Sequence, residues 1–138
     1  HEKQMLLNVQ GGFESKRLDL MKLNPLATVA QILQARQAAR SIDMQENVLD
    51  YLLALIQRTR KHPDILLGAS PRSAVSWLQA SKAYACLSGR KFVTPDDVKA
   101  IAPPLLRHRL ILRPEAQLDG LIMDNVVESI LTQVPVPR

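Results

Sequence analysis

Several kinds of residue are scarce in this sequence, and each scarcity excludes a class of protein. The 138 residues include a single cysteine, Cys86, which excludes a disulfide framework and a metal site built from cysteines alone. Aromatic side chains make up only 4% of the residues, so the core must be aliphatic. No apolar run approaches the roughly 20 residues that a bilayer span needs, and no signal-peptide pattern follows His1. We therefore expect no membrane partner, a cytoplasmic setting, and a chain that is a piece of a longer protein or a processed product.

Known catalytic patterns are also missing. The sequence has neither a G-x-x-x-x-G-K-[ST] phosphate loop nor a G-x-G-x-x-G motif, and its three histidines have no neighbours at metal-ligand spacing. The serines of residues 70–81 are better explained as cap and helix residues than as nucleophiles. Asp96 and Asp97 fit a helix start better than an acid/base pair. We predict that this chain alone is not an enzyme and holds no metal.

The chain carries an excess of positive charge, with 18 lysines and arginines against 13 aspartates and glutamates and a net charge of +5. Such a balance raises nucleic acid as a partner. The cations, however, come in small groups near expected helix ends, where they complement the helix dipole and need no ligand. A basic helical DNA-binding module is the alternative function. Its recognition helix would need a polar face that the largely apolar helix candidates lack.

Capping and helix-breaking residues predict a chain that is helical almost throughout. Thr28 followed by Gln31 has the spacing of a capping box, and Asp43 followed by Glu46 repeats it. Two further starts combine a serine or threonine N-cap with a proline at the first helical position. We expect helices over residues 3–9 and 124–133 and others that begin after Thr28, Asp43, Ser70 and Thr94, with Pro63 and Gly89 ending the third and the fourth.

One segment departs from the helical pattern. After Pro103–Pro104, residues 105–116 (LLRHRLILRPEA) alternate charged and apolar side chains, which indicates a short strand or an extended arm. We expect it to pair with residues 40–44, ahead of the third helix. The predicted fold class is therefore all-α, a small helical bundle with room for one short two-stranded β element.

Arg72 stands where the rest of the sequence avoids positive charge. It is the second residue of the expected fourth helix, at the positive end of the helix dipole. One interpretation is an exposed arginine that costs a few tenths of a kcal/mol up to ~1 and is offset by an ion pair with Asp64. The other is a site where an anion such as phosphate binds to the helix N-terminus and the guanidinium together. The spacing alone leaves both open.

Four motifs follow one another in the second half of the chain. They are G-A-S-P-R at Gly68–Arg72, G-R at Gly89–Arg90 after an Ala-rich helix, V-T-P-D-D-V at Val93–Val98, and L-R-H-R-L at Leu106–Leu110. This order resembles the C-terminal, sensor-2 lid of MoxR-type AAA+ ATPases, and the resemblance extends over nearly the whole chain from about Asn24. A lid of the magnesium-chelatase type is a related possibility that these motifs favour less.

The resemblance implies a helical lid over residues 24–138, with residues 1–23 leading away from an ATPase core outside this chain. In such proteins ATP lies between the core and the lid, and the sensor-2 arginine reaches the γ-phosphate. Carried over, Arg72 is that arginine, with a catalytic and nucleotide-binding role. Ser70 and Pro71 shape the helix start beside the nucleotide. ATP and Mg²⁺ would belong to the parent ATPase, and this fragment alone should hold neither.

The resemblance also implies partners. They are the parent's own AAA+ core, the neighbouring subunits of a ring that is commonly a hexamer, and proteins with von Willebrand factor A domains, in a chaperone-like role. His108 and Arg109 match the family's H-R pair. We expect them to be structural or to lie at a subunit contact, and we do not assign them to ATP.

Overall fold

The computed structural model describes residues 1–13 and 24–137, and its chain divides into two compact units, His1–Ile32 and Leu33–Arg138. The first unit contains α1 (Glu2–Gln10), whose residues are all exposed and which ends at Gly11. This helix confirms the one predicted over residues 3–9. The second part of the stretch expected to lead away from a core, residues 14–23, lies outside the described residues, and the domain boundary at residue 23 stays a prediction.

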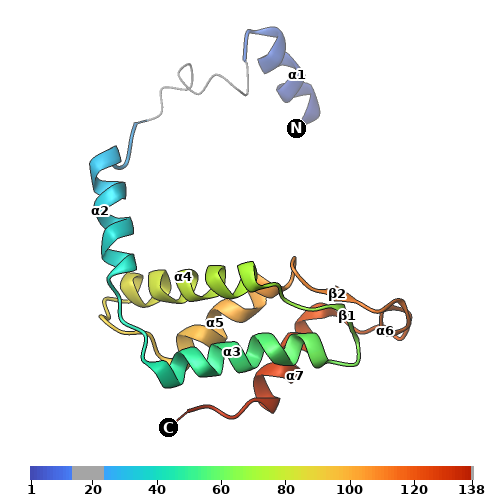
Figure 1. Cartoon of the computed structure of the whole chain (residues 1–138). Coiled ribbons are helices and arrows are strands. Elements are labelled where there is room, and N and C mark those ends of the chain that lie inside the picture. Colours follow the sequence, from blue (N-terminus) through green and yellow to red (C-terminus); the bar gives the residue numbers. More distant parts are fainter. Residues whose placement is uncertain (14–23, 138) are drawn as a thin grey trace. The chain divides into compact units, whose positions relative to one another are not determined.

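The second unit is a small helical bundle with one short two-stranded sheet (Figure 1). Among its helices, α4 packs most extensively on α5 and also contacts α3, while α7 packs on α3 and α5. The predicted fold class is confirmed. The boundary between the two units falls within α2 (Val29–Arg40), and the elements that follow are α3 (Glu46–Lys61), β1 (Ile65–Leu67), α4 (Pro71–Leu87), α5 (Pro95–Leu106), β2 (Ile111–Leu112), α6 (Pro114–Leu118) and α7 (Met123–Gln133).

The start of α2 is fixed by the expected capping box. The backbone N–H of Thr28 donates to Gln31 Oε1 at 2.8 Å, and the N–H of Gln31 donates to Thr28 Oγ1 at 3.2 Å. No residue of α2 is buried, although its apolar residues recur at helical spacing. The periodicity therefore predicted the helix correctly but did not correspond to a buried face.

The core of the second unit is aliphatic, as the scarcity of aromatic residues predicted. Trp77 on α4 is the largest side chain in it and is fully buried. Its indole Nε1 donates to the carbonyl oxygen of Val98 at 2.9 Å, which joins α4 to α5. Around it lie buried branched residues of three helices, among them Leu52, Leu55 and Ile56 of α3, Val98 and Leu106 of α5, and Val126, Val127 and Ile130 of α7.

The predicted start of α3 was wrong by a few residues. The helix begins after Gln45, and no side chain caps it. Asp43, the expected cap, forms an isolated bridge instead, because its N–H donates to Lys91 O at 3.1 Å and its carbonyl accepts from Val93 N at 2.9 Å. The carbonyl of an N-cap residue accepts the first hydrogen bond of the helix, and the carbonyl of Asp43 is engaged by Val93 instead.

The strand prediction was right in kind and wrong in partner. Leu105 and Leu106 belong to the buried face of α5, which continues through Pro103 and Pro104, so the alternating segment is mostly not extended. Only β2 is a strand, and it pairs antiparallel with β1 rather than with residues 40–44, with Ile65 opposite Leu112 and Leu67 opposite Ile111.

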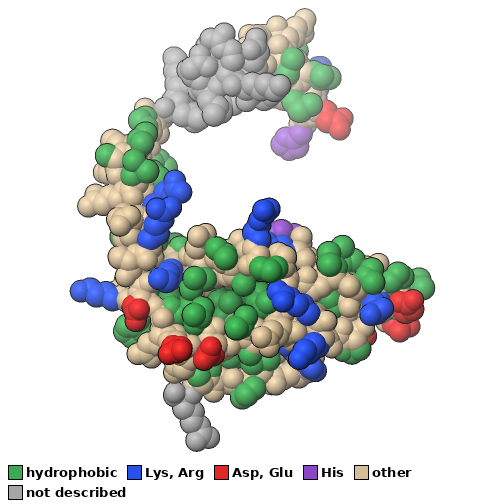
Figure 2. Space-filling model, in the orientation of Figure 1, with side chains coloured by type: hydrophobic (Ala, Val, Ile, Leu, Met, Phe, Trp, Pro, Cys, Tyr) green, Lys and Arg blue, Asp and Glu red, His purple; other side chains and the backbone are tan. Residues whose placement is uncertain are grey.

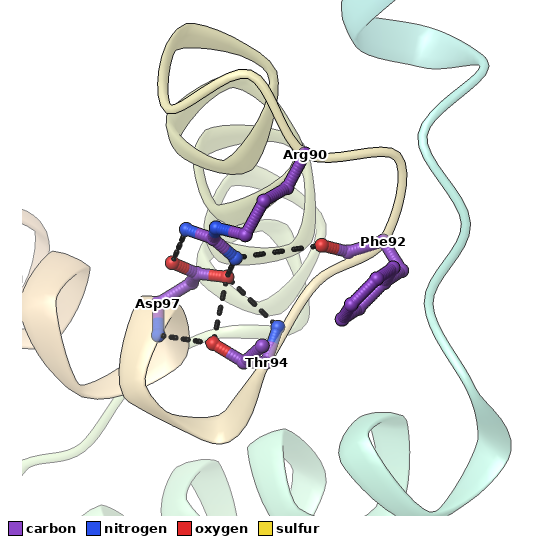
Figure 3. A network of polar contacts seen from close by, with 4 residues as sticks. All are labelled: Arg90, Phe92, Thr94 and Asp97. Carbon is purple, nitrogen blue, oxygen red and sulfur yellow. Dashed lines mark hydrogen bonds and ion pairs between the residues drawn. The ribbon is translucent and has the colours of Figure 1, made fainter.

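A polar network closes the turn between α4 and α5 (Figure 3). Gly89, with φ +72, follows the end of α4, and the N–H of Arg90 donates to Ala85 O at 3.0 Å. The Arg90 guanidinium then donates two hydrogen bonds to the carboxylate of Asp97, which is buried. Asp97 also forms a capping box with Thr94 at the start of α5. Burial alone would raise the pKa of Asp97, but the hydrogen bonds from Arg90 and Thr94 outweigh it and lower the pKa.

Candidate nucleotide-phosphate site

The fourth helix begins as its sequence predicts. Ser70 is the N-cap, and its Oγ accepts a hydrogen bond from the N–H of Ser73 at 3.2 Å. Pro71 occupies the first helical position, where its missing N–H costs no intrahelical bond. Arg72 is therefore in the first turn of α4, between Pro71, which has no N–H, and Ser73, whose N–H is bonded to Ser70.

The loop before α4 is held against the end of α3 by three contacts. The N–H of Ala69 donates to Thr59 Oγ1 at 3.0 Å, and the fully buried Thr59 donates in turn to Ile56 O at 2.7 Å. Arg60 Nε donates to the carbonyl of Ala69 at 2.8 Å. Gly68 lies so close to α3 that a Cβ on it would be 2.7 Å from the Cα of Arg60. These contacts fix the direction in which α4, and so Arg72, leaves the loop.

Gly68→Ala should therefore destabilise the fold and displace the start of α4. The added methyl group would meet the backbone of α3, which cannot move away as a flexible side-chain end could. Overpacking of this kind costs about 1–3 kcal/mol. Urea unfolding would measure the change in the free energy of unfolding. Gly89→Ala is the matched control for added strain without a clash, since Gly89 has φ +72 but open space around it. Full stability of Gly68→Ala would contradict the close approach.

Arg72 is exposed, and among the described residues no carboxylate lies within ion-pair distance of its guanidinium. Asp64, the expected partner in the simpler interpretation, lies 3.8 Å from His62 Nδ1 instead. The ion pair between Arg72 and Asp64, which the simpler interpretation requires, is therefore not formed. Arg72 faces an open pocket of about 340 Å³, which is lined by Leu67, Gly68, Ser70, Arg72, Ser73 and Arg109.

Arg109 was not expected in this pocket. It lies between α5 and β2, is partly buried, and its Nε donates to His108 Nε2 at 3.3 Å. The sequence predicted a structural or intersubunit role for this residue, which nothing in the structure tests. The pocket is thus lined by Ser70 and Arg72, whose binding role stays a prediction, and by a second arginine that the sequence reasoning did not assign to ATP. Pro71 is at the helix start but does not line the pocket.

The positive charge of the second unit is spread out. On the face shown in Figure 2, lysine and arginine side chains lie at separate places among apolar ones rather than in a continuous stripe. Within residues 1–13 and 24–137, no three His, Cys, Asp or Glu side chains are grouped closely enough to hold a metal ion. In the same residues, no helix combines the length and the apolar character needed to cross a membrane.

Comparisons with known proteins point to one family. Residues 57–132 match the model of the family described as AAA lid domain. The chain is 32% identical over 124 residues to YeaC of Bacillus subtilis, and 27% identical over 122 residues to Chaperone MoxR1 of Mycobacterium tuberculosis. The alignments cover 90% and 82% of this chain. A crystal structure of a proposed ATPase from Cytophaga hutchinsonii superposes with a TM-score of 0.77 at 27% identity, over 89% of this chain and 41% of that one.

These relatives are much longer than the chain. The matched region is 39% of YeaC and 32% of MoxR1. In all three cases the likeness extends beyond the lid residues of the family model to most of the present chain.

Proposed function

The chain belongs to the AAA lid domain family and is a lid of the MoxR-type AAA+ ATPases, and on this premise we propose that it closes over ATP held by a core outside the chain. In this proposal Arg72 contacts the γ-phosphate of that ATP. Ser70 caps the helix from which Arg72 extends, and Pro71 sets its first turn. The observation that carries the proposal is the exposed Arg72 at the positive end of α4, with no described carboxylate to neutralise it.

The electrostatics of the first turn favour an anion. The helix dipole gives the start of α4 a partial positive charge, and the guanidinium adds a full one. These two positive charges repel each other, and a bound phosphate group would stabilise both of them. In phosphoryl transfer the γ-phosphate oxygens share negative charge in the transition state, so a cation held in position lowers the barrier. The contacts of Gly68 and Ala69 with α3 support this role, because they fix where the helix that carries Arg72 begins.

ATP and Mg²⁺ would be held mainly by the parent protein's core. The pocket beside Arg72 has no carboxylate among its lining residues, so it suits phosphate oxygens and offers no ligand that Mg²⁺ prefers. When bound, Mg²⁺ would neutralise charge on the phosphates. The chain contributes a cation and a closing surface, while nucleotide hydrolysis is an activity we assign to the parent ATPase as a whole.

The lid is built to move as one piece. Thr59, Arg60 and Gly68 join α4 to α3, Trp77 and the Arg90–Asp97 pair join α4 to α5, and α7 packs on both α3 and α5. A pull on Arg72 by the γ-phosphate would therefore rotate the whole bundle and relay the nucleotide state to neighbouring subunits. We place the parent in a cytoplasmic ring, as a hexamer with a chaperone-like role alongside von Willebrand factor A domain proteins.

Arg72→Ala in the full-length parent is expected to lower ATP turnover at least tenfold while ATP still binds. Loss of a contact made in the transition state reduces turnover, and a tenfold fall corresponds to about 1.4 kcal/mol. Steady-state turnover and nucleotide binding on the same variant would measure both. Arg72→Lys tests the fork geometry, because it keeps the charge but loses the bidentate donors.

The control is Arg36→Ala, which removes one positive charge from an exposed position on α2. Unchanged turnover and binding in Arg72→Ala would contradict the proposed role of Arg72. Steeply salt-dependent binding of duplex DNA by the same protein would then favour the basic DNA-binding module.

A further inference from the structure

We propose that Arg109 is a second phosphate-binding residue, which contacts the same terminal phosphate as Arg72. This inference rests on the proposed function, because it takes the pocket beside Arg72 as the place of the ATP phosphate. It goes further in assigning to the nucleotide a residue from a different part of the chain, between α5 and β2.

The register of the two-stranded sheet explains why the two arginines share a pocket. Leu67 at the end of β1 lies opposite Ile111 at the start of β2, and the strands run antiparallel. The residues that follow β1 and those that precede β2 therefore leave the same end of the sheet. Gly68 to Arg72 continue from β1 there, and Arg109 precedes β2 by a single residue, Leu110.

The backbone around Arg109 is as well anchored as the loop before α4. The N–H of Arg109 donates to Leu106 O at 2.9 Å, and the N–H of Leu110 donates to the same carbonyl at 3.1 Å. Leu106 and Leu110 are both buried. The side chain of Arg109 is partly buried and has His108 as its hydrogen-bond partner, but among the described residues no carboxylate lies within ion-pair distance of it.

Two guanidinium groups on one pocket repel each other when no anion lies between them. A terminal phosphate reverses this, because its several oxygens can accept bidentate hydrogen bonds from both forks. Clusters of arginines are a recurrent way in which proteins bind phosphate groups. The pocket, at about 340 Å³, is at the small end of ligand sites and suits a phosphate terminus, with the rest of the nucleotide outside it.

The chemistry therefore predicts discrimination by the terminal phosphate. ATP carries the γ-phosphate and ADP does not, so loss of Arg109 should weaken ATP binding and leave ADP binding nearly unchanged. If Arg109 had only a structural role, its loss would not produce this difference, because a loosened fold would weaken the binding of ATP and of ADP alike.

The test uses the full-length parent ATPase, with ATP and ADP affinities measured for the wild type, Arg72→Ala, Arg109→Ala and the double variant. We expect Arg109→Ala to weaken ATP binding about tenfold, with ADP affinity within about twofold of the wild type. The double variant should lose less than the product of the single losses, since both residues act on one phosphate. Arg109→Lys should recover part of the ATP affinity. Arg36→Ala should leave both affinities unchanged.

His108→Ala separates binding from support of the loop, because it removes the hydrogen-bond partner of Arg109 and keeps the guanidinium. If it matches Arg109→Ala, or if Arg109→Ala weakens ATP and ADP equally, the inference is overturned. If Arg72→Ala alters ATP turnover and Arg109→Ala leaves ATP affinity unchanged, the inference fails and the proposed function stands. If neither variant alters turnover or ATP affinity, both fail.

Discussion

Asp97→Ala is expected to lower the free energy of unfolding of the chain by about 2 kcal/mol, since it removes a buried carboxylate that accepts charge-assisted hydrogen bonds and caps a helix. Asp97 is 2% exposed, accepts two hydrogen bonds from Arg90, and accepts two more from the N–H and hydroxyl of Thr94. The substitution removes the capping box of α5 as well as the ion pair. Urea unfolding followed by the fluorescence of Trp77, the single tryptophan in the chain, would measure the loss.

The control for this substitution is the neighbouring Asp96→Ala. Asp96 is also in the first turn of α5, but its side chain is 89% exposed and lies 3.7 Å from Lys99, so its loss should cost below about 1 kcal/mol. The pKa of Asp97 is lowered in the folded state from an ordinary value of about 3.9. Its charged form therefore stabilises the fold fully above that pH, and the stabilisation is lost as pH falls through the lower folded pKa. The gap between wild type and Asp97→Ala should narrow in that acid range. A gap that stays constant with pH would contradict the ion pair as its source.

The sequence predicted the start of a helix well where the capping side chain and the backbone donor are close in sequence. Thr28 with Gln31, Ser70 with Ser73, and Thr94 with Asp97 each satisfy backbone donors only three residues away. Such contacts depend on the identity of a few neighbouring residues and on no distant part of the fold. The caps of α2, α4 and α5 are therefore predictable from the residues at each helix start.

Predictions failed where distant segments competed for the same backbone groups. Asp43 has the residue type and spacing of a cap, but its backbone pairs with the turn after α4, far along the chain. The alternating segment after Pro104 contains enough polar and apolar residues for a strand, yet Leu105 and Leu106 are buried as part of α5. Tertiary packing decided both cases, and the local pattern does not contain it.

In the candidate site, too, the features set by neighbouring residues were predictable and those set by tertiary packing were not. Arg72 could be singled out from the sequence because a cation in the first turn of a helix conflicts with the dipole, and that conflict is local. The roles of Gly68 and Thr59 could not, because they depend on how closely the loop approaches the end of α3. Arg109 reaches the pocket through the pairing of Leu67 with Ile111, and this pairing was not predicted.

Trp77→Ala is expected to destabilise the chain by about 4 kcal/mol, within the range for large-to-small substitutions of buried aromatic residues. The indole is 0% exposed and belongs to the hydrophobic core, so its removal would leave a buried cavity. The hydrogen bond from Nε1 to Val98 O would also be lost. Because domains are stable by only about 5–15 kcal/mol, this change alone should remove a large part of the stability. Circular dichroism during urea unfolding would measure it.

Two further variants separate the causes. Trp77→Phe keeps an aromatic ring but loses the hydrogen bond and part of the volume, so its cost should be no more than about half that of alanine. Leu87→Ala removes a side chain of the same helix that is 88% exposed and should change stability by less than about 0.5 kcal/mol. Equal losses in Trp77→Phe and Trp77→Ala would mean that the hydrogen bond to α5, rather than burial, holds α4 in place. In either case α4 is the element that carries Arg72, so the position of the candidate phosphate site depends on a tryptophan at some distance from it along the helix.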